Sequence, residues 1–423
     1  MKNNNILIVL YPYKFTNFLW NLLELDEISK NSNVVVWDVS QIVNNSFSRG
    51  ISASSLTRKE VVNISSILGL ILHIKFFLKR NKGSNICVLN EVARSSLTGI
   101  LVNIIVNSCF KAINAKVLDL YNGGIPLAYP MDCRNVNSNH ASTDFNYRIK
   151  MLVNGSTNLK ELIYRISWNF SRRISNIFPV YITHRLVAGS TWEAFGKQDL
   201  PVGTNLVFGH SHDYSIYLTT IKFPPSQKSK KQRTAVLLDA AGPMFNSDSS
   251  LTKRRVFITS EIWYPALSNF FTILEKRTKV IVNVSGHYKS THISPAPCFG
   301  NRNVIYGSTC NMVYHSDYVI TRCSTAISYA VIFRKPILFI FSTQLSFDVQ
   351  AMREINGMAE MLGTTPINID YFPDDIELYL KVDEAKYAAY EIDVLTSSPL
   401  GRPNFQIILE DIMEIPIQAT ITK

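Results

Sequence analysis

The chain lacks the motifs that identify several large classes of protein. Its six cysteines are scattered and none forms a C-x-x-C pair, which argues against both a zinc site and a disulfide framework. We therefore expect reduced thiols, as in the cytosol. There is no G-x-x-x-x-G-K-[ST] phosphate loop, no G-x-G-x-x-G fingerprint and no G-x-S-x-G elbow. These absences argue against P-loop NTPases and α/β-hydrolases.

Long apolar runs are also missing at the start of the chain. Residues 6–10 form an apolar run of only five residues before Tyr11 and Pro12. Such a run is too short for the core of a signal peptide or for a membrane span. The sequence therefore predicts a cytoplasmic protein.

The composition is that of a globular protein with an excess of positive charge. Of 423 residues, 46% are hydrophobic and 18% are charged, and this length favours two domains. The formal net charge is +11, which indicates a polyanionic partner such as a phosphate-bearing substrate, anionic lipid or nucleic acid. Because no zinc-finger spacing or RNA-binding motif accompanies the charge, we expect no nucleic-acid partner.

Short apolar runs alternate with helical spacing along residues 1–221, which we predict to be the first domain. Such alternation indicates a parallel sheet with helices on both faces. The predicted strands are 6–10, 34–36, 85–90 and 116–120, and the predicted helices are 17–29, 64–79 and 97–113.

A basic, proline-containing stretch at 222–233 has no periodic apolar spacing and is predicted to be a linker. A second domain, 234–400, then repeats the alternation, and the tail 401–423 contains an amphipathic helix (403–415) that could pack back across the junction. The predicted strands of this domain are 235–238, 280–284, 303–306, 318–321 and 337–341, and its helices are 260–276 and 326–333. Two doubly wound α/β domains leave a cleft between them, and ligands bind beyond the carboxyl ends of such strands.

Ser324 and Thr325 follow the predicted strand 318–321 and stand where the next helix is expected to begin. Hydroxyl side chains and free amides at a helix start favour a bound phosphate. The alternative is that Ser324 only caps the helix.

The block 299–340 resembles the nucleotide-binding half of bacterial O-antigen and capsule proteins, which are similar to sialyltransferase-like GT-B enzymes that use CMP-activated sugars. The segments YPYKFTNFLWNLLELDEISK (11–30) and GHSHDYSIYL (209–218) resemble other parts of the same group. The resemblance implies the GT-B fold, with two Rossmann-like domains facing a central cleft. It also implies that Ser324 and Thr325 hold the phosphate of CMP, with Gly307 of the same block at the donor site.

One histidine and three carboxylates are candidates for the catalytic groups. The resembling families carry a His-Pro motif where this chain has His287 followed by Tyr288, so His287 is expected to stabilise the leaving phosphate, or else to be a surface-loop residue. Asp239, at the end of strand 235–238, is the first candidate for the catalytic base, with a turn or cap role as the alternative. Asp213 and Glu261 are competing candidates.

No metal or other cofactor is expected. The chain contains no Asp-x-Asp, the pair with which single-domain sugar transferases hold a divalent ion. The cluster His210, Ser211, His212, Asp213 matches no standard metal site, and on a strand its two imidazoles would share one face while Asp213 points away. Structural or substrate-orienting roles are favoured for it.

Two apolar segments with basic ends, 64–80 and 97–111, leave two alternatives open. They are either core helices of the first domain, which we favour, or helices with part of one face resting on a membrane.

The sequence as a whole favours a metal-independent glycosyltransferase of surface-polysaccharide synthesis. Its donor would be a nucleotide sugar, and a CMP-activated nonulosonic acid is the donor we favour. Its acceptor would be a glycan or lipid-linked oligosaccharide at the inner face of the plasma membrane. The alternatives are a UDP-sugar transferase, a UDP-sugar 2-epimerase or a non-catalytic protein of polysaccharide assembly.

Overall fold

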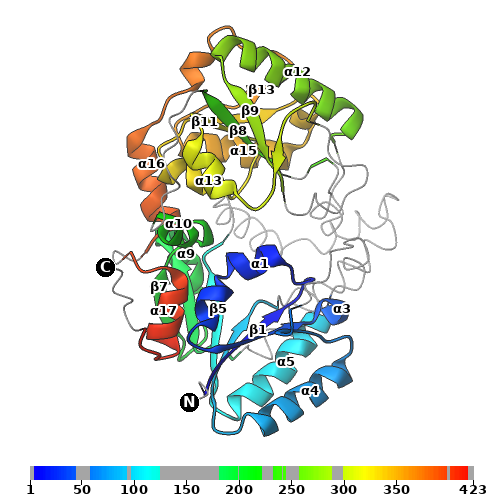
Figure 1. Cartoon of the computed structure of the whole chain (residues 1–423), viewed down its shortest axis with the longest axis vertical. Coiled ribbons are helices and arrows are strands. Elements are labelled where there is room, and N and C mark those ends of the chain that lie inside the picture. The colour runs from blue at the N-terminus through cyan, green and yellow to red at the C-terminus, as the bar shows by residue number, and fades with distance from the viewer. Residues whose placement is uncertain are drawn as a thin grey trace, which may run out of the picture.

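The computed structural model describes residues 4–43, 58–92, 97–123, 181–198, 200–221, 232–240, 242–243, 257–287, 299–397 and 401–417. They form two lobes, each built around a parallel sheet (Figure 1). All of the predicted linker 222–233 except its last two residues lies outside the described residues.

The first sheet has the strand order β3-β2-β1-β4-β5-β6-β7, and the second has the order β10-β9-β8-β11-β12-β13. The strands of the first are β1 Asn5–Tyr11, β2 Asn33–Asp38, β3 Val61–Asn63, β4 Asn85–Asn90, β5 Lys116–Tyr121, β6 His184–Ala188 and β7 Asn205–Gly209. Those of the second are β8 Thr234–Leu238, β9 Ile281–Ser285, β10 Val304–Ile305, β11 Tyr318–Thr321, β12 Ile337–Phe341 and β13 Ile367–Asn368. In each sheet the first strand in the chain, β1 or β8, lies in the interior. The next two strands are added on one side of it and the later strands on the other, which defines a doubly wound fold. The predicted fold class is confirmed.

Helices flank both sheets. In the first lobe and at the junction they are α1 Asn17–Leu22, α2 Leu25–Ser29, α3 Ser40–Val43, α4 Ile67–Arg80, α5 Leu97–Lys111, α9 Gly189–Gln198 and α10 His212–Ile221. In the second lobe they are α12 Ser260–Thr278, α13 Thr309–His315, α14 Ile327–Ile332, η2 Leu345–Phe347, α15 Val349–Met361, η3 Ile376–Tyr379 and α16 Glu384–Tyr390. The final elements are the π-helix η4 Glu391–Leu395, α17 Asn404–Ile407 and the π-helix η5 Ile408–Ile412.

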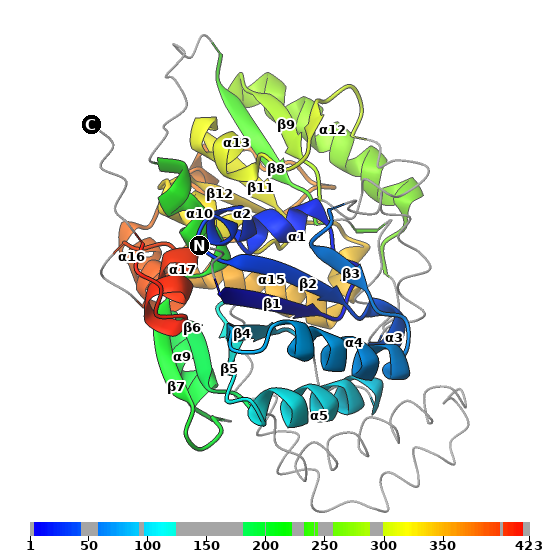
Figure 2. The ribbon, with the colours of Figure 1, turned by 60° about the horizontal axis from the view of Figure 1, so that its bottom comes forward.

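The central strand β1 is buried on both faces, which explains its uninterrupted apolar sequence. Its alternate side chains enter two separate cores. Leu7 and Val9 pack with residues of α1, α2 and the C-terminal α17–η5 segment. Ile6 and Ile8 pack with residues of α4 and α5 on the opposite face. Figure 2 shows α4 and α5 side by side below the sheet.

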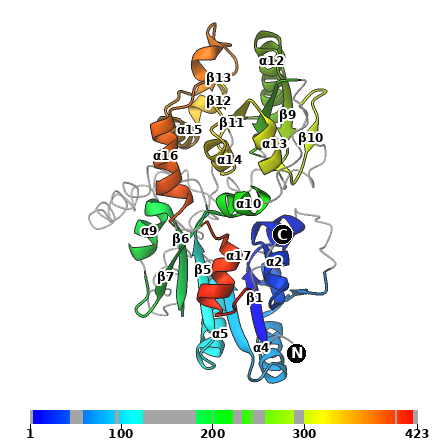
Figure 3. The ribbon, with the colours of Figure 1, turned by 60° about the vertical axis from the view of Figure 1, so that its left-hand side comes forward.

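The chain crosses between the lobes near its C-terminus. After α16, η4 packs against α9, where Gly189 has a left-handed φ of 65° and a Cβ would lie 2.4 Å from the carbonyl oxygen of Asp393. Only glycine fits this close approach. Ile407 and Ile412 then enter the core of the first lobe, and Figure 3 shows α17 beside β5. The helix α10 lies between the lobes and packs on α13 and α14.

Several predicted elements differ in detail from those observed. The predicted helix 17–29 is two helices, because Glu24 adopts a left-handed conformation with φ 52°. The predicted helix 64–79 begins later, at Ile67, with Ser66 accepting a hydrogen bond from the Gly69 amide at its start. The strands β6 and β7 were not predicted, because their polar and glycine-containing sequences weaken the apolar pattern. No described helix is long and apolar enough to cross a membrane.

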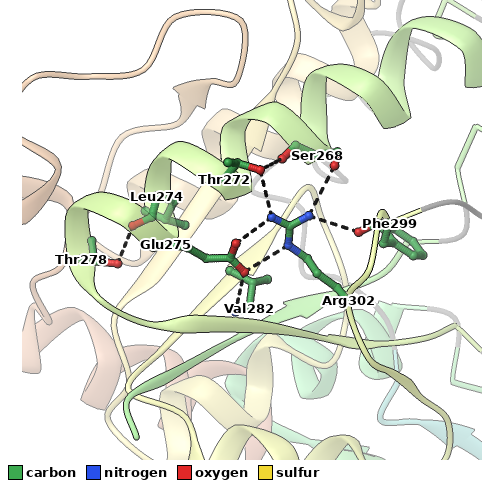
Figure 4. A network of polar contacts seen from close by, with 8 residues as sticks. All are labelled: Ser268, Thr272, Leu274, Glu275, Thr278, Val282, Phe299 and Arg302. Atoms are coloured by element: carbon green, nitrogen blue, oxygen red, sulfur yellow. Dashed lines mark hydrogen bonds and ion pairs between the residues drawn. The ribbon is translucent and has the colours of Figure 1, made fainter.

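A polar cluster ties α12 to the loop before β10 (Figure 4). Arg302 donates to both carboxylate oxygens of Glu275, at 3.2 and 2.8 Å, and also to Ser268, Thr272 and the carbonyl oxygen of Phe299. Glu275 in turn accepts from the amide of Val282, so the ion pair fixes α12 against β9.

Replacing Arg302 with alanine is expected to lower the free energy of unfolding by about 2–3 kcal/mol, measured by denaturant titration. Its side chain is only 10% exposed, so removal leaves the Glu275 carboxylate without its charged partner. The exposed pair Lys30–Glu27 supplies a matched control, and Lys30→Ala is expected to cost less than about 0.5 kcal/mol. Equal losses in the two variants would contradict a structural role for the Arg302 cluster.

Candidate functional site

A cleft of about 1020 Å³ lies between the two lobes. From the second lobe it is lined by the residues that follow the carboxyl ends of β8, β9, β10 and β11. From the first lobe it is lined by α1, Glu24 and the residues after β5, and α10 forms part of its wall. This is the place where doubly wound sheets bind ligands.

The second-lobe edge of the cleft is rich in small and hydroxyl residues. Gly307 lines the cleft with φ 75°, a conformation that favours glycine, and precedes Ser308 and Thr309 at the start of α13. The hydroxyls of Thr309 and Ser285 lie 2.8 Å apart and join the end of β9 to the start of α13. This edge offers neutral hydrogen-bond donors to an anionic ligand.

Ser324 and Thr325 both line the cleft, just ahead of the predicted helix 326–333, which the structure shows as α14. They form a turn, and α14 begins later, at Ile327. The Ser324 hydroxyl accepts a hydrogen bond from the Ala326 amide at 3.3 Å, and Thr325 is exposed. Ser324 therefore both caps the turn and faces the cleft, so the two alternatives for this residue are compatible.

Asp239 and His287 lie at neighbouring strand ends and both line the cleft. The backbone amide of His287 donates to the Asp239 carboxylate at 3.3 Å. Burial lowers the pKa of Arg322, and nearby negative charges, that of Asp239 among them, act in the opposite direction. A Cβ on Gly242 would lie 2.7 Å from the Arg322 guanidinium, so this glycine makes room for the arginine. Asp239 thus fixes the loop that carries His287.

Asp213 lies in the first turn of α10 and faces the same cleft. Burial raises the pKa of its carboxyl group to about 7, and hydrogen bonds with Tyr329 and Ser328 act in the opposite direction. A carboxyl group with this pKa exchanges a proton readily near neutral pH. Glu261 is exposed in the first turn of α12 and does not line the cleft.

His210 to Asp213 do not form a strand in the structure. His210 follows β7, and its ring contacts the Thr396 hydroxyl at 2.8 Å and the carbonyl oxygen of Arg402 at 2.9 Å. His212 begins α10 and lines the cleft. Burial lowers the pKa of both imidazoles to about 4, so both are neutral at pH 7. His210 is a structural residue of the domain junction.

Glu24 is a cleft residue that the sequence did not point to. It accepts a short hydrogen bond from Ser215 of α10, and burial raises the pKa of its carboxyl group to about 7. Its second oxygen, Oε1, is buried without a hydrogen-bond partner. The left-handed backbone at Glu24 is uncommon for a residue with a side chain, and such strain occurs often at functional sites.

The described lining of the cleft is acidic, whereas the chain as a whole carries a net positive charge. Its described lining contains no lysine or arginine. The ionisable carboxyl and imidazole groups of this lining are Glu24, Asp26, Glu27, Asp213, Asp239, His212 and His287. Within the part of the chain that the structure describes, no group of three or more His, Cys, Asp or Glu residues is arranged to hold a metal ion.

No protein-family model matches the sequence, and no curated protein matches it significantly. Among solved structures, the chain is similar to the wall teichoic acid polymerase TagF in its H444N variant, with a TM-score of 0.51 and 13% identity over 98% of this chain and 90% of that one. The chain has the GT-B fold. At this identity the likeness establishes the fold alone.

Two further solved structures cover nearly the whole chain with lower TM-scores. A candidate UDP-N-acetylglucosamine 2-epimerase from Listeria monocytogenes gives a TM-score of 0.46 at 10% identity, over 96% of this chain and 95% of that one. The spinosyn forosaminyltransferase SpnP gives 0.43 at 11% identity, over 95% and 94%.

Proposed function

We propose that this chain is a glycosyltransferase. A nucleotide-activated sugar binds at the second-lobe edge of the cleft, and an acceptor hydroxyl enters from the first lobe. The observation that carries the proposal is the composition of the cleft. Hydroxyl and glycine residues at the carboxyl ends of β9, β10 and β11 face a carboxyl group, that of Asp213, whose pKa is about 7. Donors for a leaving phosphate and a base for an acceptor thus line one cavity.

In the proposed reaction the oxygen of the acceptor hydroxyl bonds to the anomeric carbon of the sugar, and Asp213 takes the proton of that hydroxyl. The bond from that carbon to the phosphate oxygen breaks, and its electron pair leaves with the nucleotide. His287, Ser324, Thr325 and the Gly307 turn stabilise this negative charge, without a metal ion. Asp239 acts as a positioning residue, because it accepts the His287 amide. We favour Asp213 over Asp239 as the base, since the Asp239 carboxylate already accepts a hydrogen bond from that amide and interacts electrostatically with Arg322.

The proposed donor is a CMP-activated nonulosonic acid, for synthesis of a surface polysaccharide on a glycan or lipid-linked acceptor. The sequence resemblance around Ser324 and Thr325 supports the nucleotide. The charge of the described cleft lining independently supports a nucleoside monophosphate as the leaving group. A nucleoside monophosphate leaving group carries less negative charge than a diphosphate, and the described lining contains no lysine or arginine to balance the difference.

CMP is expected to raise the melting temperature of the protein more than UDP or GDP at equal concentration. A ligand that binds only the native state stabilises it by RT ln(1 + [L]/Kd), so the order of the shifts follows the order of the affinities. Thermal unfolding with CMP, CDP, UDP and GDP measures this order. A preference for UDP would contradict the CMP donor but not the glycosyltransferase proposal. If no nucleotide stabilises the protein, both the donor and the glycosyltransferase proposals are refuted.

One observation favours a second candidate, a UDP-sugar 2-epimerase. Such an enzyme needs a dense set of acidic and histidine side chains in the cleft, and the described lining contains five carboxyl groups and two imidazoles. Incubation with a UDP-sugar in the absence of any acceptor separates the two candidates. Only the epimerase converts the sugar under these conditions, which NMR of the anomeric protons detects.

A further inference from the structure

The helix α4 turns large apolar side chains toward solvent. Leu68 and Phe76 are 66% and 67% exposed, and Ile71 and Leu72 are 43% and 44% exposed. The spacing of these four residues places them on one face of a helix. Leu70 and Ile74, on the opposite face, are buried against the first sheet. The helix is therefore apolar on both its inner and its outer face.

Positive charge accompanies the outer face. Lys75 and Lys79 are exposed and lie on the same side of the helix as Leu68 and Leu72, and Arg80 and Lys82 follow at its end. No acidic residue occurs anywhere in residues 61–90. The surface thus combines apolar side chains with charge of a single sign.

The neighbouring helix α5 continues this surface. It packs beside α4 on the same face of the sheet (Figure 2). Leu97 and Leu101 are 44% and 43% exposed, and Lys111 is exposed near its end. The helix contains no acidic residue.

We propose that the outer face of α4 and α5 binds the surface of an anionic membrane. Leu68, Ile71, Leu72 and Phe76 would enter the boundary between headgroups and acyl chains, as the apolar face of an interfacial helix does. Lys75 and Lys79 have flexible apolar stems, which let their ammonium groups reach lipid phosphates while neighbouring side chains are buried.

The charge decides between this partner and two others. A symmetric contact with a second copy would place lysines against lysines without an acidic residue to balance them. A nucleic acid would satisfy the lysines but leave Leu68 and Phe76 against a polar backbone. An anionic bilayer satisfies both kinds of side chain. The proposal does not depend on the chemistry of the cleft.

Cosedimentation with lipid vesicles tests the proposal on the full chain. Binding is expected to vesicles of equal parts phosphatidylglycerol and phosphatidylcholine, to weaken as salt is raised, and to be much weaker with phosphatidylcholine alone. The double variant Leu68→Ser/Phe76→Ser is expected to bind the anionic vesicles at least about tenfold more weakly. The variant Lys75→Gln/Lys79→Gln is expected to bind the same vesicles with an affinity lower by about fivefold for each lysine removed.

The second lobe provides a matched control. Phe347 at the end of η2 and Val349 at the start of α15 are 68% and 65% exposed, so Phe347→Ser/Val349→Ser removes a similar exposed apolar pair. Vesicle binding by this variant is expected to equal that of the parent. Equal loss in both double variants, or full binding by Leu68→Ser/Phe76→Ser, would overturn the proposal. So would a dimer in light scattering that the α4 variant abolishes, because the face would then bind a second copy.

Discussion

Replacing His287 with alanine is expected to lower kcat by about 10²–10³, while the affinity for the nucleotide changes little. The imidazole would contact a phosphate whose charge grows as the sugar leaves, so its contribution is greatest in the transition state. Steady-state kinetics with CMP-sugar and acceptor, in buffer containing EDTA, together with CMP binding by calorimetry, measure the two effects separately.

Ser324→Ala is the matched control for this experiment. Its hydroxyl would touch the phosphate in the ground state as well, so much of its loss is expected as weaker donor binding rather than as a lower kcat. Neither side chain is part of the apolar core, and both variants are expected to melt near the parent temperature. If His287→Ala transfers sugar at the parent rate, His287 is a loop residue and the leaving phosphate is stabilised by other groups.

The fold was predictable because parallel strands covered on both faces are almost wholly apolar. Residues 6–10 and 337–341 are such runs, and both are strands of the structure. The strands β6 and β7 were not predicted, because their sequences are not such apolar runs. The strand β6 contains His184 and Arg185, and the buried Arg185 pairs with Asp119 of β5 at 2.8 Å. A local pattern does not reveal a partner 66 residues away.

The candidate site was predictable where a strand end could be recognised. Asp239 and His287 follow apolar strands, and the carboxyl ends of parallel strands meet at one edge, so both reach the cleft. Glu24 could not be found in this way. It lies between two helical segments, and its place in the cleft depends on Ser215, which is 191 residues distant. Its sequence context, Leu23 and Leu25, indicates only an amphipathic helix.

Replacing Asp213 with asparagine is expected to lower kcat/KM by about 10²–10⁴, the contribution typical of a general base. The parent is expected to gain activity as the pH rises through about 7, because Asp213 must lose its proton before it can accept another. Asp213→Asn should lose this rise along with the rate. Asp239→Asn should keep it, since Asp239 only positions the His287 loop.

Stability measurements separate a loss of chemistry from a loss of fold in the Asp213→Asn variant. Burial raises the pKa of Asp213 in the folded state above its unfolded value, so the native protein binds the proton more tightly. The contribution of Asp213 to the free energy of unfolding is therefore fully present at pH values below the unfolded pKa of about 4, and it is lost as the pH rises through about 7. Asparagine carries no charge to bury, and the variant is expected to melt no lower than the parent at pH 8.

Glu24 provides the decisive control, because its carboxyl group has the same pKa of about 7 and lies in the same cleft. A rise in activity through pH 7 could therefore come from either group. If Asp213 is the base, Glu24→Gln keeps the rise and Asp213→Asn abolishes it. If Glu24→Gln abolishes the rise while Asp213→Asn retains it, the base lies on the first lobe. Asp213 would then be a structural partner of Ser328 and Tyr329 on α14.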